Sequence, residues 1–211
     1  MNHNLMKMMS FKRIFLALLL ASMASVFCQA KEEKDIYDMS LDDNLECPLL
    51  GRQANVISSF QYKEAMSLSK LYKDRVELMR NNEVVVVTIP ASQLFEPNET
   101  VLTSLGIVTL KPLLKYLKTK GLYKMLLVMH SDNTGSDKYT LELTRQRVDS
   151  IYEWIEKNAS VDFVVPYALG GSDPLVENNS VDNRRTNRRL EIYLVPEAGM
   201  VEMSKKGIIR L

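Results

Sequence analysis

A run of β-branched residues, Glu83-Val84-Val85-Val86-Val87-Thr88-Ile89, constrains the fold of this chain more than any other segment. Valine, isoleucine and threonine favour extended backbone, and Pro90 ends the run, so the segment is predicted to be a strand. Its apolar residues are continuous rather than alternating, which indicates that both faces of the strand are buried. The strand is therefore expected inside the domain and not at its surface.

Three further segments are predicted to be strands, because each is short, apolar and bounded by turn residues. They cover residues 124–129, 161–168 and 190–195. Segments with helical spacing separate them. The order predicts an α/β fold, more closely an α+β sandwich of the form β-α-β-α-β, with helices on one face of a small mixed sheet.

Two segments between the strands are predicted to be helices. In the first, Pro112 fits either the first turn of a helix that begins near Leu110 or a kink in a longer helix that begins near Thr100. The second follows a polar turn at 131–137 and runs to about Asn158. Its buried face is expected to hold Leu141, Val148, Ile151 and Ile155.

An extra helix is predicted over residues 54–80, which hold no glycine or proline and carry apolar residues near the helical period. It could pack on the domain or mediate self-association. The expected organisation is a signal peptide (1–30), a poorly ordered leader (31–53), a helical segment (54–82), the main domain (83–196) and a tail (197–211).

The first thirty residues have the composition of a secretory signal, with basic residues followed by an apolar run from Ile14 to Phe27. The run is about 14 residues long, short of the roughly 20 that span a bilayer as a helix. We expect cleavage after Ala30 and export; the family resemblance described below implies the periplasm, with outer-membrane association as a further expectation. Lipidation at Cys28 is the alternative, although Phe27 fits poorly before a lipidated cysteine. Cleavage would leave Cys47 without an intrachain disulfide partner.

Asp132 and Arg147 lie fifteen residues apart, the first in the turn after a predicted strand and the second on the following helix. An acid and an arginine that converge in this way can bind a zwitterion, since the acid accepts from an ammonium and the guanidinium grips a carboxylate. The same residues also have structural interpretations. An aspartate before a helix commonly caps it, and an arginine on a helix is usually solvated.

The segment 183–189 holds four arginines in seven residues, which is typical of a solvated charged turn or of a phosphate or nucleic-acid patch. Nucleic acid is not expected as a partner, because no aromatic residues are interleaved and the net charge of the chain is only +1. His130 is the only histidine after the signal, and no nucleophile elbow or Walker loop is present. We therefore expect a protein that is not an enzyme and that uses no metal or other cofactor.

Four motifs in order resemble those of one family. The turn Leu94-Phe95-Glu96-Pro97-Asn98 follows the first strand, and Met129-His130-Ser131-Asp132-Asn133-Thr134-Gly135 is similar to Gly-His-Thr-Asp-x-x-Gly. The run from Tyr139 to Val148 is similar to Tyr-Asn-x-x-Leu-Ser-x-x-Arg-Ala, and the run from Arg184 to Leu190 to Arg-x-x-Asn-Arg-Arg-Val. From about Val84 to Val195 the chain thus resembles the OmpA-like peptidoglycan-binding domain (the OmpA/MotB/Pal carboxy-terminal family).

The resemblance implies non-catalytic binding of peptidoglycan through the meso-diaminopimelate of its stem peptides, which would anchor the cell envelope. Asp132 matches the acid that receives the ammonium, and Arg147 matches the arginine that binds the carboxylate. The further ligand-binding residues that it implies are Arg188, Asn98, Ser131 and Thr140.

Three positions depart from the family pattern. Met129 replaces glycine and is expected to add bulk at the rim of the site, Ser131 keeps the hydroxyl of the family threonine, and Thr140 replaces an asparagine. The alternative function is an assembly module of an envelope complex that acts through the helix at 54–80. Outer-membrane proteins, or a second copy of the chain, are then the candidate partners.

Overall fold

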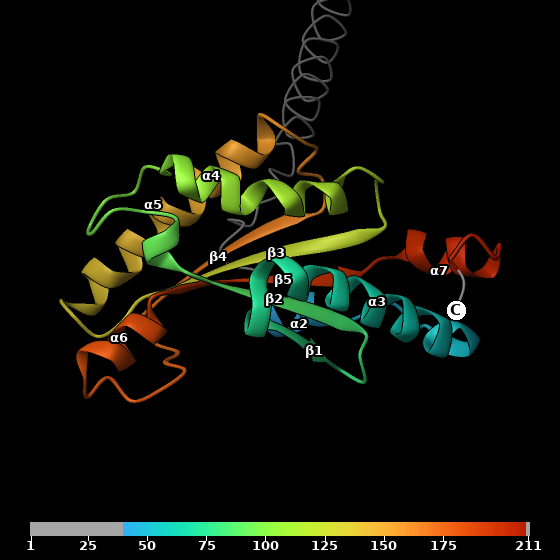
Figure 1. Ribbon diagram of the computed structural model, residues 1–211, viewed down its shortest axis with the longest axis horizontal. Helices are drawn as coiled ribbons and strands as arrows, with labels where there is room; N and C mark the ends of the chain where they lie inside the picture. Colours follow the sequence, from blue (N-terminus) through green and yellow to red (C-terminus); the bar gives the residue numbers. More distant parts are fainter. Residues whose placement is uncertain (1–39, 210–211) are drawn as a thin grey trace, which may run out of the picture. The chain divides into compact units, whose positions relative to one another are not determined.

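The computed structural model describes residues 40–209, which contain a five-stranded mixed sheet with the strand order β1-β2-β5-β3-β4 (Figure 1). Strands β3 and β4 are parallel, and the other neighbours are antiparallel. The predicted mixed sheet is confirmed, with one strand more than expected. The strands are β1 (Val76–Met79), β2 (Val84–Pro90), β3 (Tyr123–His130), β4 (Val164–Gly170) and β5 (Arg189–Pro196).

Strand β2 is buried on both faces, as its sequence predicts. Val85 and Val87 face the larger of two apolar clusters, and Val84 and Val86 face the smaller one on the other side of the sheet. None of these four valines is more than 6% exposed. The side chains alternate because successive strand residues point to opposite faces.

Most helices pack on the face with the larger cluster, and this confirms the predicted one-sided arrangement. They are α3 (Ala54–Tyr72), α4 (Ser104–Leu110) with its 3-10 continuation η5 (Lys111–Leu117), α5 (Asp137–Glu156) and α7 (Ala198–Lys205). Helix α6 (Val181–Asn187) lies at one end of the molecule, and α7 lies towards the other (Figure 1).

The opposite face of the sheet is partly covered by the amino-terminal segment of the described residues. Helix α2 (Leu41–Leu45) packs Leu41 and Leu45 against the smaller cluster, together with Cys47. Burial raises the pKa of the Cys47 thiol to about 11. The expectation of a poorly ordered leader is therefore wrong for residues 40–53, while the predicted signal peptide and the start of the leader lie outside the described residues.

The helix predicted over 54–80 ends at Tyr72, and its last residues instead form β1, which pairs with β2. Val76 and Leu78 are half-buried and alternate with exposed residues, as an edge strand requires. Positive φ angles at residues 80–82 turn the chain into β2. The spacing of Val76 and Met79 fits a helix and that of Val76 and Leu78 fits a strand, so the sequence pattern did not separate the two.

Helix α3 packs on the domain, which confirms the first of the two interpretations offered for it. The Gln61 side chain is fully buried and donates to the carbonyl oxygens of Glu83 and Leu194 (2.8 and 3.3 Å). It also accepts a hydrogen bond from the Tyr123 hydroxyl (2.9 Å). The helix is thus fixed to β3 and β5 by directed bonds as well as by apolar contact.

The carboxy-terminal residues are ordered, and the expectation of a tail is wrong for residues 197–209. Helix α7 buries Met200 and Val201, and Ile209 joins the same core. The structure agrees with the first of the two expectations for Pro112, which lies in the first turn of η5 directly after Leu110, and a separate helix, α4, begins before it at Ser104. No helix within the described part of the chain is both long enough and apolar enough to cross a membrane.

Candidate functional site

The loop between β3 and α5 carries Asp132 and is fixed at both ends. The Ser131 amide donates to the Gly170 carbonyl oxygen (2.6 Å), beside a bulge that shifts the pairing of β3 and β4. Asp132 Oδ1 accepts from the Thr134 amide (2.8 Å), and the Ser136 hydroxyl caps α5. The loop therefore holds the carboxylate of Asp132 in one orientation at a side-chain exposure of 3%.

Arg147 lies on α5 about three turns after the start of the helix, and only 4% of the residue is exposed. Its Nε donates to the Glu99 carbonyl oxygen (2.9 Å), and Nη2 donates to the Glu96 carbonyl oxygen (3.4 Å). The guanidinium also lies over the Phe95 ring, with 5.1 Å to the centroid. Burial, and secondarily the positive charge of Arg188, lowers the pKa of Arg147, while Tyr139 acts in the opposite direction.

Arg188 follows α6 and forms a close ion pair with Asp132. Asn187, which precedes it, is fully buried and ties the preceding loop to α6. Its side chain accepts from the Val176 amide (3.0 Å) and donates to the Val176 carbonyl oxygen (2.7 Å). Arg188 is thereby presented to Asp132 from a fixed backbone.

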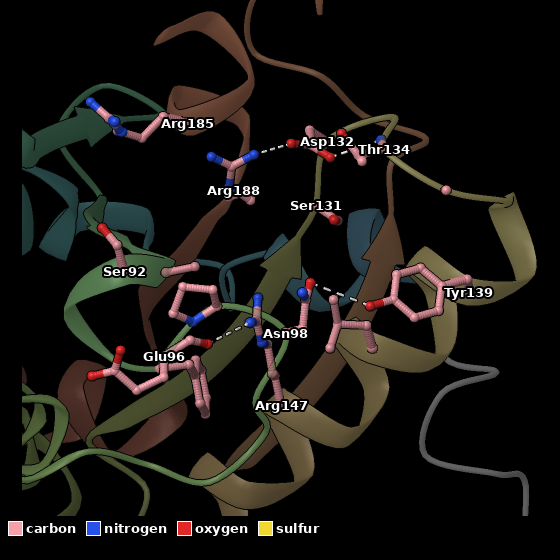
Figure 2. Close-up of a pocket in the computed structure, with 15 residues that line it drawn as sticks. Ser92, Glu96, Asn98, Ser131, Asp132, Thr134, Tyr139, Arg147, Arg185 and Arg188 are labelled. Carbon is pink, nitrogen blue, oxygen red and sulfur yellow. Dashed lines mark hydrogen bonds and ion pairs between the residues drawn. The ribbon is translucent and has the colours of Figure 1, made fainter. Parts of the chain in front are cut away.

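These three side chains line one open cavity of about 720 Å³, a size that suits a small ligand. Asp132 and Arg188 lie on one side of it and Arg147 on the other (Figure 2). The lining combines charged groups with an apolar wall. The remaining lining residues are Ala91, Ser92, Phe95, Glu96, Pro97, Asn98, Ser131, Thr134, Gly135, Tyr139, Leu143 and Arg185.

Solved structures with the same architecture include a MotB-like protein, a cell wall anchor and a periplasmic domain of MotB. A MotB-like protein from Desulfovibrio vulgaris has a TM-score of 0.56 at 20% identity, over 68% of this chain and 98% of that one. The cell wall anchor of the T6SS from Pseudomonas aeruginosa has a TM-score of 0.51 at 22% identity, over 67% and 97%. The periplasmic domain of Helicobacter pylori MotB has a TM-score of 0.51 at 17% identity, over 63% and 88%. The chain has the OmpA-like fold.

A curated relative is the Escherichia coli protein named "Probable lipoprotein YiaD", which is 24% identical over 135 residues. The match covers 64% of this chain and 62% of that protein. No family model matches the chain. The resemblance noted in the sequence is thus confirmed for the OmpA-like fold.

The structure brings five of the six predicted site residues to the cavity of the OmpA-like domain. They are Asp132, Arg147, Arg188, Asn98 and Ser131. Asn98 has a positive φ of 60° and accepts a hydrogen bond from the Tyr139 hydroxyl (3.4 Å). This contact joins the loop after β2 to the start of α5 at the edge of the cavity (Figure 2).

Thr140 does not line the cavity, contrary to the sequence prediction. It is 2% exposed, and its hydroxyl donates to the Asp137 carbonyl oxygen (3.1 Å). Thr144 is fully buried and accepts from the Gly170 amide (3.0 Å), so this side of α5 packs on the end of β4. Leu141 is 50% exposed, and its predicted place on the buried face is therefore wrong.

Met129 is also placed differently from the expectation. Its side chain is fully buried in the larger apolar cluster and does not line the cavity, so it does not reshape the rim. Four further residues line the cavity that were not predicted as site residues from the sequence: Arg185, Glu96, Thr134 and Ser92. The only signal for Arg185 was its place in the arginine run. Glu96 and Thr134 lie inside two of the quoted motifs, at positions to which the motifs give no role, and Ser92 lies in the short 3-10 helix η4 (Ala91–Gln93).

A second charged cluster lies buried beside the cavity. His130 is 1% exposed, and its ring nitrogens lie 3.5 Å from Glu191 Oε2 and 3.8 Å from Asp173 Oδ2 without forming hydrogen bonds to described residues. Glu191 pairs with Arg189 Nε (2.7 Å) and accepts from the Tyr193 hydroxyl. Within residues 40–209, no group of three or more histidine, cysteine, aspartate or glutamate side chains could hold a metal ion.

Proposed function

We propose that this protein binds peptidoglycan noncovalently, through the meso-diaminopimelate of its stem peptides, and that it anchors the cell envelope. One observation carries the proposal. Asp132 and Arg147 are both almost fully buried, yet both line the same open cavity. Buried charges of opposite sign beside an open space favour a ligand that carries both signs itself.

The ammonium of the diamino acid would bind Asp132. The Asp132 carboxylate is oriented by the Thr134 amide, and Arg188 balances its charge before a ligand arrives. A carboxylate has about four acceptor sites, so it can receive an ammonium while it keeps these partners. The ammonium would thus share Asp132 with Arg188, and binding would not depend on breaking the ion pair.

The carboxylate of the same amino acid would bind Arg147. A guanidinium has five N–H donors, of which two are used by the carbonyl oxygens of Glu96 and Glu99. Its other donors are available, and no described carboxylate forms an ion pair with it. The methylene chain of the diamino acid would pass the apolar wall formed by Phe95, Pro97 and Leu143.

A binding role, rather than a catalytic one, agrees with these contacts. The charged groups pair with one another or with backbone carbonyl oxygens, and His130 lies outside the cavity lining. General acid or base chemistry would need such a group to exchange a proton with the ligand, whereas Asp132 is engaged by Arg188 and by the Thr134 amide. We propose that the site holds its ligand by charge and hydrogen bonds alone.

The proposed location is the periplasm, where peptidoglycan is accessible. Two lines support it: the amino-terminal signal that the sequence predicts, and the shared fold with a cell wall anchor and with a periplasmic domain. The name of the curated relative supports lipidation at Cys28 as the alternative to cleavage after Ala30. Mass spectrometry of the mature amino terminus would distinguish the two.

The test is cosedimentation with purified sacculi. We expect Asp132→Ala and Arg147→Ala each to weaken binding by about 2–5 kcal/mol, because each leaves its partner charge on the ligand desolvated and unpaired. Asp132→Asn is the sharper variant, since the amide oxygen can still accept from the Thr134 amide. Binding by all three variants at the wild-type level would end the proposal.

The second candidate function, an assembly module acting through residues 54–80, depends on what α3 leaves exposed. Ile57, Ala65 and Leu68 are used for packing on the domain. Tyr62 and Met66 remain about half exposed, one helical turn apart. Light scattering of a Tyr62→Ser/Met66→Ser double variant would reveal a loss of self-association if this face mediates it.

A further inference from the structure

The four arginines between Asn183 and Arg189 form two pairs that differ in their contacts. Arg184 Nη1 donates to the Asn178 carbonyl oxygen (3.0 Å), and Arg189 pairs with Glu191 in the buried cluster. These two arginines stabilise the fold. Arg185 and Arg188 instead line the cavity. They are three residues apart on and just after α6, a spacing that places side chains on the same side of a helix.

Arg188 and Arg185 differ in their partners. Arg188 pairs with the buried Asp132, whereas Arg185 has its ion pair with Asp182 on the same helix at 3.4 Å. The side chains of Arg185 and Asp182 are 64% and 89% exposed. Such surface pairs contribute little, so an anionic ligand could replace Asp182 at low cost.

The charges of the cavity also indicate an additional anion. Three arginines and two acids line it, namely Arg147, Arg185, Arg188, Asp132 and Glu96. Asp132 and Arg188 balance each other, and a zwitterionic ligand centre leaves that balance unchanged. Arg185 then remains as a cationic group beyond the place of the diamino acid, and Figure 2 shows it past Arg188, on the side away from Tyr139.

We infer that Arg185 forms a second anion subsite at the mouth of the cavity and that the preferred ligand is a stem peptide with a free terminal carboxylate close to its diamino acid. The inference rests on the proposed function, and it narrows the ligand class. The diamino acid supplies the ammonium for Asp132 and the carboxylate for Arg147. The terminal carboxylate of the following residue is the group that Arg185 receives.

This subsite would let the protein distinguish peptide ends. A peptide whose terminal carboxylate has been converted to an amide keeps its diamino acid but loses the group for Arg185. Since the guanidinium is largely exposed, the contact is a solvated charge-assisted hydrogen bond. We expect it to change affinity by about threefold to tenfold, and to weaken as salt rises.

The experiment uses isothermal titration of the full mature chain with two synthetic peptides. Both have the sequence L-alanine, γ-D-glutamate, meso-diaminopimelate, D-alanine, and one ends in a free acid while the other ends in an amide. Wild type should bind the acid about threefold to tenfold more tightly. Arg185→Ala should bind both peptides equally, at the wild-type affinity for the amide. Arg185→Lys should restore part of the preference.

The matched control is Arg52→Ala, because Arg52 is an exposed arginine that does not line the cavity. It should keep the wild-type preference. Equal binding of the two peptides by wild type, or an unchanged preference in Arg185→Ala, would overturn the inference and leave the proposed function standing. If wild type bound neither peptide, or if Asp132→Asn bound both as tightly as wild type, the proposed function would fail and this inference with it.

Discussion

Arg188 and Arg189 are neighbours in the chain, yet their ion pairs lie in opposite surroundings. The Arg188–Asp132 pair opens onto the cavity, and the Arg188 side chain is 37% exposed. The Arg189–Glu191 pair is closed, with side-chain exposures of 3% and 13%. Arg188 has extended backbone at the end of α6, directly before β5 begins at Arg189, and adjacent residues of extended backbone point to opposite sides. The closed pair therefore serves stability, while the open pair leaves a buried acid facing the cavity, where a ligand can reach it.

The largest effect should follow from breaking the closed pair. Arg189→Ala leaves the Glu191 carboxylate buried beside His130 without its cationic partner. We expect a loss of about 3–5 kcal/mol in the free energy of unfolding, measured by urea titration. Arg185→Ala is the control and should change stability by less than about 0.5 kcal/mol, because its pair is exposed. Equal losses of stability in the two variants would contradict the claim that the buried Arg189–Glu191 pair stabilises the fold more than an exposed pair does.

The pH dependence of stability tests the contribution of Glu191, the acid of the closed pair, in a second way. Burial alone would raise the pKa of Glu191, but the nearby His130, the Tyr193 hydroxyl and Arg189 outweigh it and lower the pKa from 4.5 to about 2. A lowered folded pKa contributes stability above the unfolded value of about 4.5, which is lost as the pH falls towards 2.

We expect stability to fall by about 2–3 kcal/mol over that range through this residue. Urea titrations of wild type and Glu191→Gln at pH 5 and pH 2.5 would measure it. The variant should be the less stable protein at pH 5 and should lose less stability on acidification. A variant with the full wild-type loss would show that Glu191 is not the group responsible.

A smaller effect is expected at Gly171, which lies against the backbone of the open pair. A Cβ atom there would lie 2.7 Å from the Asp132 carbonyl oxygen and 3.2 Å from its carbonyl carbon. Gly171→Ala should therefore displace the loop, with a loss of about 1 kcal/mol in stability and about threefold in binding to sacculi. Leu175→Ala, at an exposed residue nearby, should leave both unchanged. A Gly171→Ala protein with unaltered binding would show that the position of Asp132 is not critical.

The sequence predicted the sheet better than the helices. Strands β2, β3 and β5 follow from apolar runs that admit only one interpretation, and Val84 to Val87 indicated burial on both faces. Strand β1 was missed because its apolar residues fit a continuing helix as well as an edge strand. Only pairing with β2, through contacts that the local pattern does not contain, decides between them.

The sequence also predicted part of the cavity lining, but not all of it. The positions of Asp132 and Arg147 in the chain, and the family resemblance for Arg188, pointed to three residues that do line the cavity, because the strand and helix ends that place them can be read from the sequence. Thr140 was misplaced because its burial depends on a hydrogen bond within α5 and on packing against β4. Arg185 was not singled out, since four arginines in seven residues look alike until tertiary contacts assign two of them to the fold.

The most direct test of the central claim is the affinity of wild type and Arg147→Gln for two stem peptides, one with meso-diaminopimelate and one with L-lysine, which lacks the second carboxylate. We expect wild type to prefer the diaminopimelate peptide by about 2–3 kcal/mol, roughly 30-fold to 150-fold, and Arg147→Gln to bind the two almost equally. Equal binding of both peptides by wild type, or a preference that survives the loss of Arg147, would contradict it.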